Sequence, residues 1–579
     1  MFSKTSISTA RSLFQRSSSL FTKHNNSGKN FEKVSRRFKS SNADKEKYFN
    51  EYGSRPEYLQ NKRKTSLLPL FLAGGLVPLV LTPMFVDYWI RSDREHGDPN
   101  LEEYLEHRRV KEEIKKDKER NSRDVTVASA KKTEATKYKY ILIGGGTASY
   151  AALKAIKKND PSAQVLIVTG EEYAPYERPP LSKELWSSNK ADELKFVNWL
   201  GQETSVEYEP ISAYESDPST TLLTKTKVVQ LDTHNQVVTT SDGKQYSYEK
   251  CLIATGGTPR ELPGSDLFPN NVTTFRTIND YKKLAAVAKK DNAHIVIVGG
   301  SFLGTELSYA VANKLRDKKG SKVTQVYLEP DVLARWIPRY LSERVRQTLV
   351  AAGVDLKPNR NVVNVEPSNN KDKVVVSLDS GEKIEADYVV TTTGIYPNTY
   401  IAEEAGLEID PQNSGIVTNS QLEAVQNVFV AGDVLSYYDV VLGRRRSEHH
   451  EHAEATGRHA GTNMSSNAKK PFHHISMFWS DIGDIHFQAV GEINSSLDTY
   501  AVWDDVIVRQ NGSSWATSAA PVVASNYGNG IVYYLRDKKV VGILMWNVPD
   551  KLSHARKVIL EKKQYQSLDE LKNKIQLKK

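Results

Sequence analysis

The chain has 579 residues, of which 39% are hydrophobic and 26% are charged, and at roughly 150 residues per domain this length predicts three or four domains. The composition is close to the average for soluble proteins, which excludes wholesale disorder and a multi-span membrane protein. The single cysteine, Cys251, excludes an intramolecular disulfide, a Cys-x-x-Cys redox pair and a zinc site built on several thiolates.

The net charge of +9 comes from the amino-terminal part of the chain. Residues 1–66 hold 15 Lys and Arg against 5 Asp and Glu, whereas the remaining residues hold 64 against 65. Residues 1–43 are rich in serine and contain a single acid, Glu32, which is the composition of a mitochondrial transit peptide. The alternative interpretation is a disordered basic arm. The segment Arg36 to Ser40 is a candidate processing region.

Residues 66–86 are uncharged and rich in Leu, Val and Phe. A helix of this length reaches about 30 Å, the thickness of the hydrocarbon core, so the segment predicts a transmembrane anchor. Three prolines weaken the helix, and a buried or interfacial segment is the alternative. The basic residues 62–64 precede the segment, and the positive-inside preference places the rest of the chain in the intermembrane space.

Residues 87–136 are dense in charge and poor in apolar residues, which predicts a solvated linker. The first folded signal follows: an apolar strand at 140–143 leads into a Gly144-Gly145-Gly146-Thr147-Ala148 turn, a helical stretch, and a second strand at 164–168 that ends near Glu171. This is the order of a dinucleotide-binding unit, in which the helix amino terminus faces the pyrophosphate. Ser149 stands at the third glycine position.

The same order recurs 155 residues later. A strand at 294–298 leads into Gly299-Gly300-Ser301-Phe302-Leu303-Gly304, a helix follows from Thr305, and a strand at 322–328 ends at Glu329. Two such units predict two bound dinucleotides. A carboxylate at the position of Glu329 suits a free ribose 2′-hydroxyl and repels a 2′-phosphate, which favours NADH over NADPH.

Three further strands end on small residues. Segments 252–257 and 389–394 each follow one glycine turn, and segment 428–433 ends in Gly432-Asp433, which resembles the flavin-ribityl contact of flavoproteins. We therefore expect an α/β fold with two Rossmann-like domains, in which an FAD domain is split by an inserted NAD domain.

Longer motifs carry a resemblance to a family. The segments 176–186 (YERPPLSKELW), 251–260 (CLIATGGTPR), 443–450 (GRRRSEHH) and 476–481 (SMFWSD) make residues 137–579 resemble the apoptosis-inducing factors, FAD- and NADH-binding flavoproteins of the mitochondrial intermembrane space. The resemblance implies the membrane-anchored form and an α+β carboxy-terminal domain. The expected parts are a transit peptide at 1–43, an anchor at 66–86, a linker at 87–136, FAD-domain segments at 137–270 and 401–470, an NAD domain at 271–400 and a carboxy-terminal domain at 471–579.

The resemblance also implies site residues. For FAD these are Arg178, Lys183, Val228, Arg276, Asp433, His449, His450 and Trp479. The first glycine turn (Gly144, Gly146, Thr147, Ala148) joins them from its own motif, and Glu171 joins them as the substitute for the acid that is missing at Gly170. For NADH they are Gly300, Phe302, Leu303, Glu306, Glu329, Arg335 and Asn547, and the candidate catalytic residues are Lys183, Glu306, His449 and Trp479. The sequence departs from animal members at Gly170, which replaces an acid, at Arg335, which replaces a lysine, and at Gln488, which replaces a glutamate.

Each assignment has a structural alternative. Lys183 and Glu306 are either an ion pair beside the flavin, where a cation stabilises the anionic reduced ring, or ordinary surface groups. His449, His450 and His452 are either flavin-site residues or a metal cluster. Trp479 is either a stacking partner of the cofactors or core. The arginines at 444–446 are either a DNA-contacting patch or a solvated loop; any DNA contact is expected to be sequence-independent and sensitive to salt.

Three functions follow as hypotheses. The first is an FAD-dependent NADH oxidoreductase, in which the protein brings the nicotinamide ring of NADH and the flavin ring into contact. The second is a type II NADH:quinone oxidoreductase or a monodehydroascorbate-reductase-like enzyme. The third is a redox-sensing assembly factor whose output is binding: the resemblance implies a long-lived charge-transfer complex, homodimerisation on NADH reduction and docking to the intermembrane-space import machinery. The resemblance also implies support of respiratory-chain biogenesis. After release into cytosol and nucleus, it implies a pro-apoptotic role with DNA binding.

Overall fold

The computed structural model describes residues 135–198, 200–503, 507–510 and 528–577, and all of them belong to one compact unit, Ser129–Lys579. The predicted transit peptide at 1–43, the predicted anchor at 66–86 and the linker up to residue 134 lie outside these residues. Within the described ranges, no helix has both the length and the apolar character needed to cross a bilayer.

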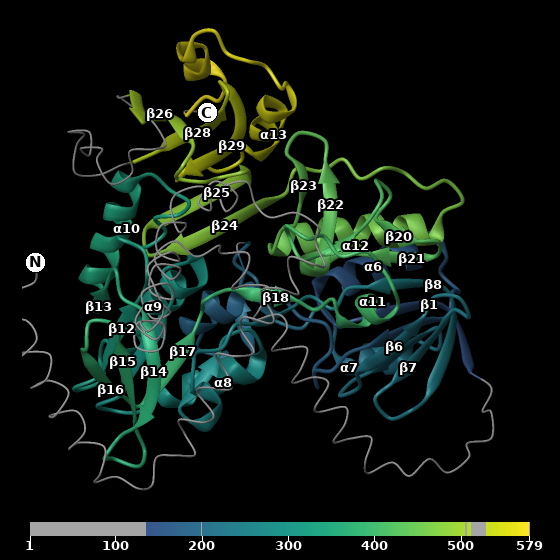
Figure 1. Cartoon of the computed structure of the whole chain (residues 1–579), viewed down its shortest axis with the longest axis horizontal. Coiled ribbons are helices and arrows are strands. Elements are labelled where there is room, and N and C mark those ends of the chain that lie inside the picture. The colour runs from purple at the N-terminus through teal and green to yellow at the C-terminus, as the bar shows by residue number, and fades with distance from the viewer. Residues whose placement is uncertain (1–134, 199, 504–506, 511–527, 578–579) are drawn as a thin grey trace, which may run out of the picture. The chain divides into compact units, whose positions relative to one another are not determined.

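The first sheet has eight strands in the order β20-β21-β8-β1-β2-β5, with β7 beside β8 and β6 beside β7. Figure 1 labels β1, β6, β7, β8, β20 and β21 of this sheet. Strands β21, β8, β1, β2 and β5 run parallel, and the apolar runs of β1 and β2 are buried, as parallel sheets covered on both faces require. The strands are β1 (Thr136–Ile143), β2 (Val165–Val168), β5 (Thr220–Leu223), β6 (Val228–Asp232), β7 (Val237–Thr240), β8 (Gln245–Ile253), β20 (Glu423–Val425) and β21 (Val428–Val430).

Two helices lie side by side next to this sheet, α6 (Thr147–Asn159) and α12 (His450–Ser465) (Figure 1). Their contact is made of small residues: a Cβ at Gly457 would lie 2.1 Å from the carbonyl oxygen of Ala148. The close approach brings the start of α12 next to the first glycine turn. The shorter helices of this part are α7 (Ile211–Ser216) and α11 (Tyr400–Glu404).

The second sheet has five parallel strands in the order β10-β17-β11-β12-β13. They are β10 (Val272–Thr274), β11 (His294–Val298), β12 (Lys322–Val326), β13 (Val354–Lys357) and β17 (Tyr388–Thr391), with helices α8 (Ile278–Val287), α9 (Phe302–Leu315) and α10 (Arg339–Ala351). A three-stranded antiparallel sheet follows within the same stretch of chain: β14 (Val362–Pro367), β15 (Val374–Leu378) and β16 (Lys383–Ala386).

The chain passes into and out of the second sheet through two paired strands, β9 (Gly257–Pro259) and β18 (Ile395–Pro397). Next to them, the Thr255 hydroxyl donates to the Asn398 carbonyl at 2.8 Å, and the Asn398 amide donates to the Thr255 carbonyl at 2.9 Å. The first sheet is thus interrupted in sequence between β8 and β20, and the second sheet forms within that interruption.

A third sheet is antiparallel and has the order β24-β25-β29-β28-β26-β27. Its strands are β24 (Met477–Ile482), β25 (Ile485–Gly491), β26 (Asp498–Trp503), β27 (Ile507–Gln510), β28 (Gly530–Arg536) and β29 (Lys539–Trp546), with helix α13 (Leu552–Leu560). Short pairs complete the fold: β3 (Lys195–Val197) with β4 (Glu203–Ser205), and β22 (Leu435–Asp439) with β19 (Ile416–Val417) and β23 (Gly443–Arg445).

The second dinucleotide unit differs from the expectation at two element boundaries: β12 ends at Val326, two residues before the predicted end at 328, and α9 begins early. Strand β11 lies where the sequence predicts it, but α9 begins at Phe302, three residues before Thr305. Ser301 is the extended N-cap residue, so the helix starts directly after the glycine turn. Phe302 and Glu306 consequently share one face of α9, one turn apart.

Candidate functional site

A cavity of about 280 Å³ lies where the first sheet, the second sheet and strand β24 meet, near the lower end of the roughly 300–1,000 Å³ usual for ligand pockets. Its lining comes from distant parts of the sequence. The first glycine turn, the segment at 178–183, the start of α9, the segment at 432–433, the start of α12 and β24 all contribute. Thirteen of the predicted site residues line it: Gly146, Thr147, Ala148, Arg178, Lys183, Arg276, Phe302, Leu303, Glu306, Asp433, His449, His450 and Trp479.

The first glycine turn has the shape that a dinucleotide needs. Gly144 has φ +116°, and a Cβ there would lie 2.2 Å from the carbonyl oxygen of Ala254. A Cβ at Gly146 would have no atom within 4 Å. Gly146 is the N-cap residue of α6, and no side chain caps this end of the helix. The amide groups of the first turn of α6 therefore retain donor capacity for a pyrophosphate at the cavity wall.

The second glycine turn repeats this geometry. Gly299 has φ +128°, and its Cβ would lie 2.7 Å from the carbonyl oxygen of Thr392. Ser301 gives α9 no side-chain cap. The side chains of the first turns of α9, Phe302, Leu303 and Glu306, line the same cavity as the first glycine turn. The two dinucleotide units thus open toward one space.

Lys183 and Glu306 form a buried ion pair in the cavity wall. The Lys183 Nζ lies 2.7 Å from Glu306 Oε2, and the side chains are 10% and 5% exposed. Ser182 donates to the same carboxylate oxygen at 3.1 Å, and Ser480 donates to Oε1 at 2.6 Å. Four groups from three segments of the chain therefore hold one charged pair at the cavity, which excludes the reading as ordinary surface groups.

Aromatic rings cover one side of the cavity. His449 stacks on Phe478 with centroids 4.5 Å apart, and His450 meets Trp479 edge-on at 5.8 Å. Phe302 contacts Phe478 at 4.9 Å. Burial lowers the pKa of His449 to about 4 and also lowers the pKa of His450, so both rings are neutral near pH 7 and accept or donate a single hydrogen bond at each nitrogen.

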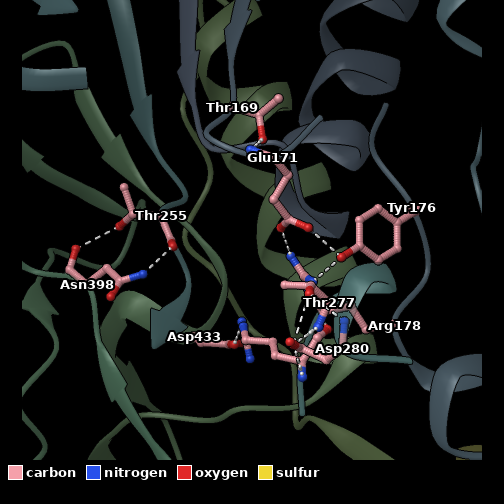
Figure 2. A network of polar contacts seen from close by, with 10 residues as sticks. Thr169, Glu171, Tyr176, Arg178, Thr255, Thr277, Asp280, Asn398 and Asp433 are labelled. Atoms are coloured by element: carbon pink, nitrogen blue, oxygen red, sulfur yellow. Dashed lines mark hydrogen bonds and ion pairs between the residues drawn. The ribbon is translucent and has the colours of Figure 1, made fainter. Parts of the chain in front are cut away.

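A polar network lies at the edge of the cavity (Figure 2). Both carboxylate oxygens of Glu171 are engaged, one by the Tyr176 hydroxyl and one by Arg178, each at 2.6 Å. Arg178 also donates to the main-chain carbonyl of Arg276 at 3.0 Å, and Arg276 pairs with Asp433 at 2.9 Å. Burial alone would raise the pKa of the Glu171 carboxyl, but Arg178 and Tyr176 outweigh it and hold that pKa below its usual value.

The other predicted site residues do not belong to the lining of this cavity. They are Gly144, Glu171, Val228, Gly300, Glu329, Arg335 and Asn547. Glu329 pairs with Arg335 at 2.6 Å, and the Arg335 side chain is 63% exposed. The side-chain oxygen of Asn547 accepts from the backbone N–H of His486 at 2.8 Å. Val228 begins β6 and packs against the core of the first sheet.

Sequence reasoning missed Ser182, Phe478 and Ser480. Each adjoins a predicted residue. For the two residues of β24, the available signal was the alternation of side chains along a strand: Phe478 and Ser480 face one side, and Trp479 faces the other. The hydroxyl of Tyr208, which donates to Thr147 at 2.9 Å, had no sequence signal.

The arginine loop and the histidine cluster both have partners within the fold. Arg444 and Arg446 donate to the main-chain carbonyls of Ser436, Thr418, Asn413 and Asp433, so these arginines tie the loop to the fold. His452 is fully buried, and its Nδ1 lies 2.8 Å from the Ser476 hydroxyl. In the described part of the chain, no three His, Cys, Asp or Glu side chains are placed to hold a metal ion.

Two family matches cover most of the described chain. Residues 138–457 match the pyridine nucleotide-disulphide oxidoreductase family. Residues 460–514 and 504–561 match the carboxy-terminal domain of mitochondrion-associated apoptosis-inducing factor.

Individual relatives agree with these matches. The chain is 38% identical over 445 residues to apoptosis-inducing factor 1, mitochondrial, of Dictyostelium discoideum, which covers 76% of this chain and 81% of the relative. It is 36% identical over 479 residues to a putative apoptosis-inducing factor 1 of Drosophila melanogaster, covering 75% and 64%.

A solved structure shows the same fold. The ferredoxin reductase of Rhodopseudomonas palustris superposes with a TM-score of 0.60 at 23% identity, covering 73% of this chain and 95% of that one. The family matches and the relatives at 36–38% identity agree with the two glycine turns that face one cavity. The chain therefore belongs to the apoptosis-inducing factor family within the pyridine nucleotide-disulphide oxidoreductases, and is an FAD-dependent NAD(P)H oxidoreductase.

Proposed function

We propose that this protein oxidises NADH with its bound FAD and that the cavity between the two dinucleotide units is where the two cofactors meet. The observation that carries the proposal is that the amino-terminal turns of α6 and α9 line the same space. When both cofactors are bound, the chemistry they supply is hydride transfer from the nicotinamide to the flavin.

The residues of the chain supply placement and charge. The amides at the start of α6 and the carboxylate of Asp433 are proposed to hold FAD, with Arg178 and Arg276 fixing the position of Asp433 and the adjoining loop. Glu171 is proposed to act through Arg178 rather than directly, because both of its oxygens are engaged within the protein. The Lys183 ammonium, held by Glu306, stabilises negative charge that develops on the flavin.

The NADH end is proposed to consist of Gly300, Phe302, Leu303, Glu329, Arg335 and Asn547. Phe302 and Leu303 lie at the cavity, whereas Glu329 lies beyond the end of β12 and pairs there with the exposed Arg335, as expected for the two ends of an extended dinucleotide. The rings of His449 and Trp479 are proposed to cover the nicotinamide and the flavin. NADH is proposed to be preferred because Glu329 repels a 2′-phosphate.

The wider biology is proposed from family membership. It comprises the transit peptide at 1–43 and the anchor at 66–86, an inner-membrane protein whose body lies in the intermembrane space, a long-lived charge-transfer complex, dimerisation on reduction, contact with the import machinery, and sequence-independent DNA binding after release. The domain boundaries at 137–270, 271–400, 401–470 and 471–579 remain proposals as well; the interruption of the first sheet by the second supports the split FAD domain.

The experiment is an anaerobic titration of the purified full chain with NADH, in which absorbance and size-exclusion chromatography are both measured at each step. We expect one non-covalent FAD, bleaching with a stoichiometric amount of NADH, a long-wavelength band that persists, and an increase in size on reduction. A colourless protein that FAD cannot reconstitute would contradict the proposal. Turnover faster with quinones than with artificial dyes would favour the quinone-reductase alternative instead.

A further inference from the structure

Strand β24 contacts helix α9 at two positions whose spacing along the strand matches their spacing along the helix. Phe478 lies 4.9 Å from Phe302, and Ser480 donates to Glu306 at 2.6 Å. Phe302 and Glu306 are one turn apart on the helix, a rise of about 6 Å. Phe478 and Ser480 are two residues apart on the strand, a rise of about 6.7 Å. The strand and the helix therefore match in spacing, and a shift of β24 by one residue would break both contacts.

The carboxylate of Glu306 receives donors at both oxygens. Oε2 takes the Lys183 ammonium at 2.7 Å and the Ser182 hydroxyl at 3.1 Å, and both donors come from one short segment. Oε1 takes Ser480 at 2.6 Å, and Ser480 is fully buried. The orientation of the carboxylate thus depends on a donor from the third sheet as well as on the segment that carries Lys183.

The next residue of the strand faces the other way. Trp479 meets His450 edge-on at 5.8 Å, and His450 is the first residue of α12. One strand of the carboxy-terminal sheet therefore contacts the helix of the second dinucleotide unit with one face and the helix that covers the first unit with its other face.

We propose that Ser480 is a positioning residue of the redox site: by holding Oε1 of Glu306 it keeps Oε2 on Lys183 and so fixes the ammonium at the cavity. The inference rests on the proposed function, because it takes Lys183 to act on bound flavin. It gives the carboxy-terminal sheet a direct part in the chemistry, since a displacement of β24 would release Glu306 and with it the position of the Lys183 charge.

The test compares Ser480→Ala with wild type and with Ser182→Ala as full chains. Hydrogen bonds to a charged group are worth roughly tenfold or more in an equilibrium, so we expect Ser480→Ala to keep its FAD but to be reduced by NADH about tenfold more slowly, with KM for NADH nearly unchanged. The flavin midpoint potential should fall by about 30 mV, the two-electron equivalent of that tenfold change. Ser182→Ala is the matched control, because Oε2 keeps Lys183 when that hydroxyl is lost; its effect should be clearly smaller.

A second comparison shows whether Ser480 acts through Glu306. In a Glu306→Gln background, Ser480→Ala should add little to the change in either the reduction rate or the potential, whereas independent effects would multiply in the rate and add in the potential. Ser480→Thr, which keeps the hydroxyl, should restore the wild-type potential. If Ser480→Ala does not fold, Ser480→Cys, a weaker donor of nearly the same size, must fall between wild type and Glu306→Gln.

The outcomes separate the inference from the function beneath it. A wild-type protein that binds no FAD, or that NADH does not reduce, would overturn the proposed function. A wild-type protein that NADH reduces, with a Ser480→Ala variant of unchanged potential, or with effects that multiply with Glu306→Gln, would overturn the role of Ser480 alone.

Discussion

The two glycine turns of this chain have nearly the same backbone but different neighbours. Gly144 and Gly299 both have positive φ, and in both a Cβ would meet the carbonyl oxygen of a residue that follows a neighbouring strand, Ala254 or Thr392. The helix after the first turn is covered by α12, whose small residues approach it closely. The helix after the second turn presents Phe302 and Glu306 to the cavity. The same glycine-turn motif is therefore followed by a helix packed against α12 in the first unit and by a helix that presents two side chains to the cavity in the second. The neighbouring elements, and not the motif, make this difference.

The acids that end the two units differ in the same way. Glu171 is enclosed by Tyr176 and Arg178, and Arg178 reaches on to the backbone of Arg276 (Figure 2). Glu329 has a single exposed partner, Arg335. Both acids are partly buried, with Glu171 29% and Glu329 16% exposed, so the two differ in their protein partners and not in their exposure. This contrast suits a cofactor that stays bound and a coenzyme that exchanges.

The largest expected effect is at the turns themselves. Gly144→Ala combines an unfavourable φ with a clash at 2.2 Å, so we expect loss of FAD and a destabilisation of at least about 3 kcal/mol. Gly299→Ala also combines a positive φ with a carbonyl clash, at 2.7 Å, but the first turn stays intact; the protein should retain FAD and lose reduction by NADH. Flavin content after purification and anaerobic reduction rates measure both.

Gly353→Ala is the matched control for the turns, since its φ is +89° but nothing lies within 4 Å of its Cβ position. It carries the strain without the clash and should keep both FAD and NADH reduction. If Gly144→Ala retains its full flavin content, the two turns are not divided between the two cofactors as proposed.

The second effect concerns the ion pair that the two units share. Lys183→Met leaves the buried Glu306 carboxylate without its counter-ion, and Glu306→Gln leaves the buried Lys183 ammonium without its own. Each loss costs roughly 3–5 kcal/mol when burial is deep. The double variant removes both charges, so its loss of stability and of reduction rate should be well below the sum of the single losses. Denaturant unfolding and stopped-flow reduction of all four proteins give the coupling; additive effects would mean that the pair is not a unit.

Much of the two units could be predicted from the sequence because their signals are local. Strand β11, the glycine turns and the ends of β8, β17 and β21 all follow from apolar runs that stop at small residues. The start of α9 differed from the prediction, because Ser301 serves as N-cap although its side chain makes no cap bond. A weak cap leaves a weak sequence signal.

The site was harder to predict because its contacts join distant segments. Ser480 reaches Glu306 across 174 residues, and no spacing rule connects them. Arg178 lies only seven residues from Glu171, yet whether that arginine faces the acid or the cofactor depends on the backbone of Arg276. The resemblance supplied the residue names, whereas the partners of those residues depend on tertiary packing.

The third effect is a dependence of stability on pH at Glu171. Its pKa is lower in the folded protein than the usual value of 4.5, so the carboxylate stabilises the fold above about pH 4.5, and this contribution is lost as the pH falls through the folded pKa. Glu171→Gln should be less stable than wild type by about 1–3 kcal/mol at pH 7. The difference should shrink below pH 4.5 in denaturant unfolding measured across pH. Glu329→Gln should lose less stability at pH 7, since its partner Arg335 is 63% exposed and an ion pair with a solvent-exposed member contributes about 0–1 kcal/mol; an equal loss in both variants would remove the contrast between the two acids.

The smallest expected effect is on coenzyme preference, and it tests whether Glu329 is accessible to the ligand. Arg335 already offsets part of the Glu329 charge at 2.6 Å, so Glu329→Gln should raise kcat/KM for NADPH relative to NADH by only about fivefold, the equivalent of about 1 kcal/mol. Arg335→Ala should act in the opposite direction, because it leaves the carboxylate unopposed and removes a cation that a 2′-phosphate could use. Glu366→Gln is the control: Glu366 pairs with the similarly exposed Lys383 at 3.0 Å in the antiparallel sheet β14–β16, and its loss should not change the ratio. If Glu329→Gln and Glu366→Gln leave the ratio equally unchanged, the second acid does not face the coenzyme, and the contrast with Glu171 must rest on the protein partners of the two acids alone.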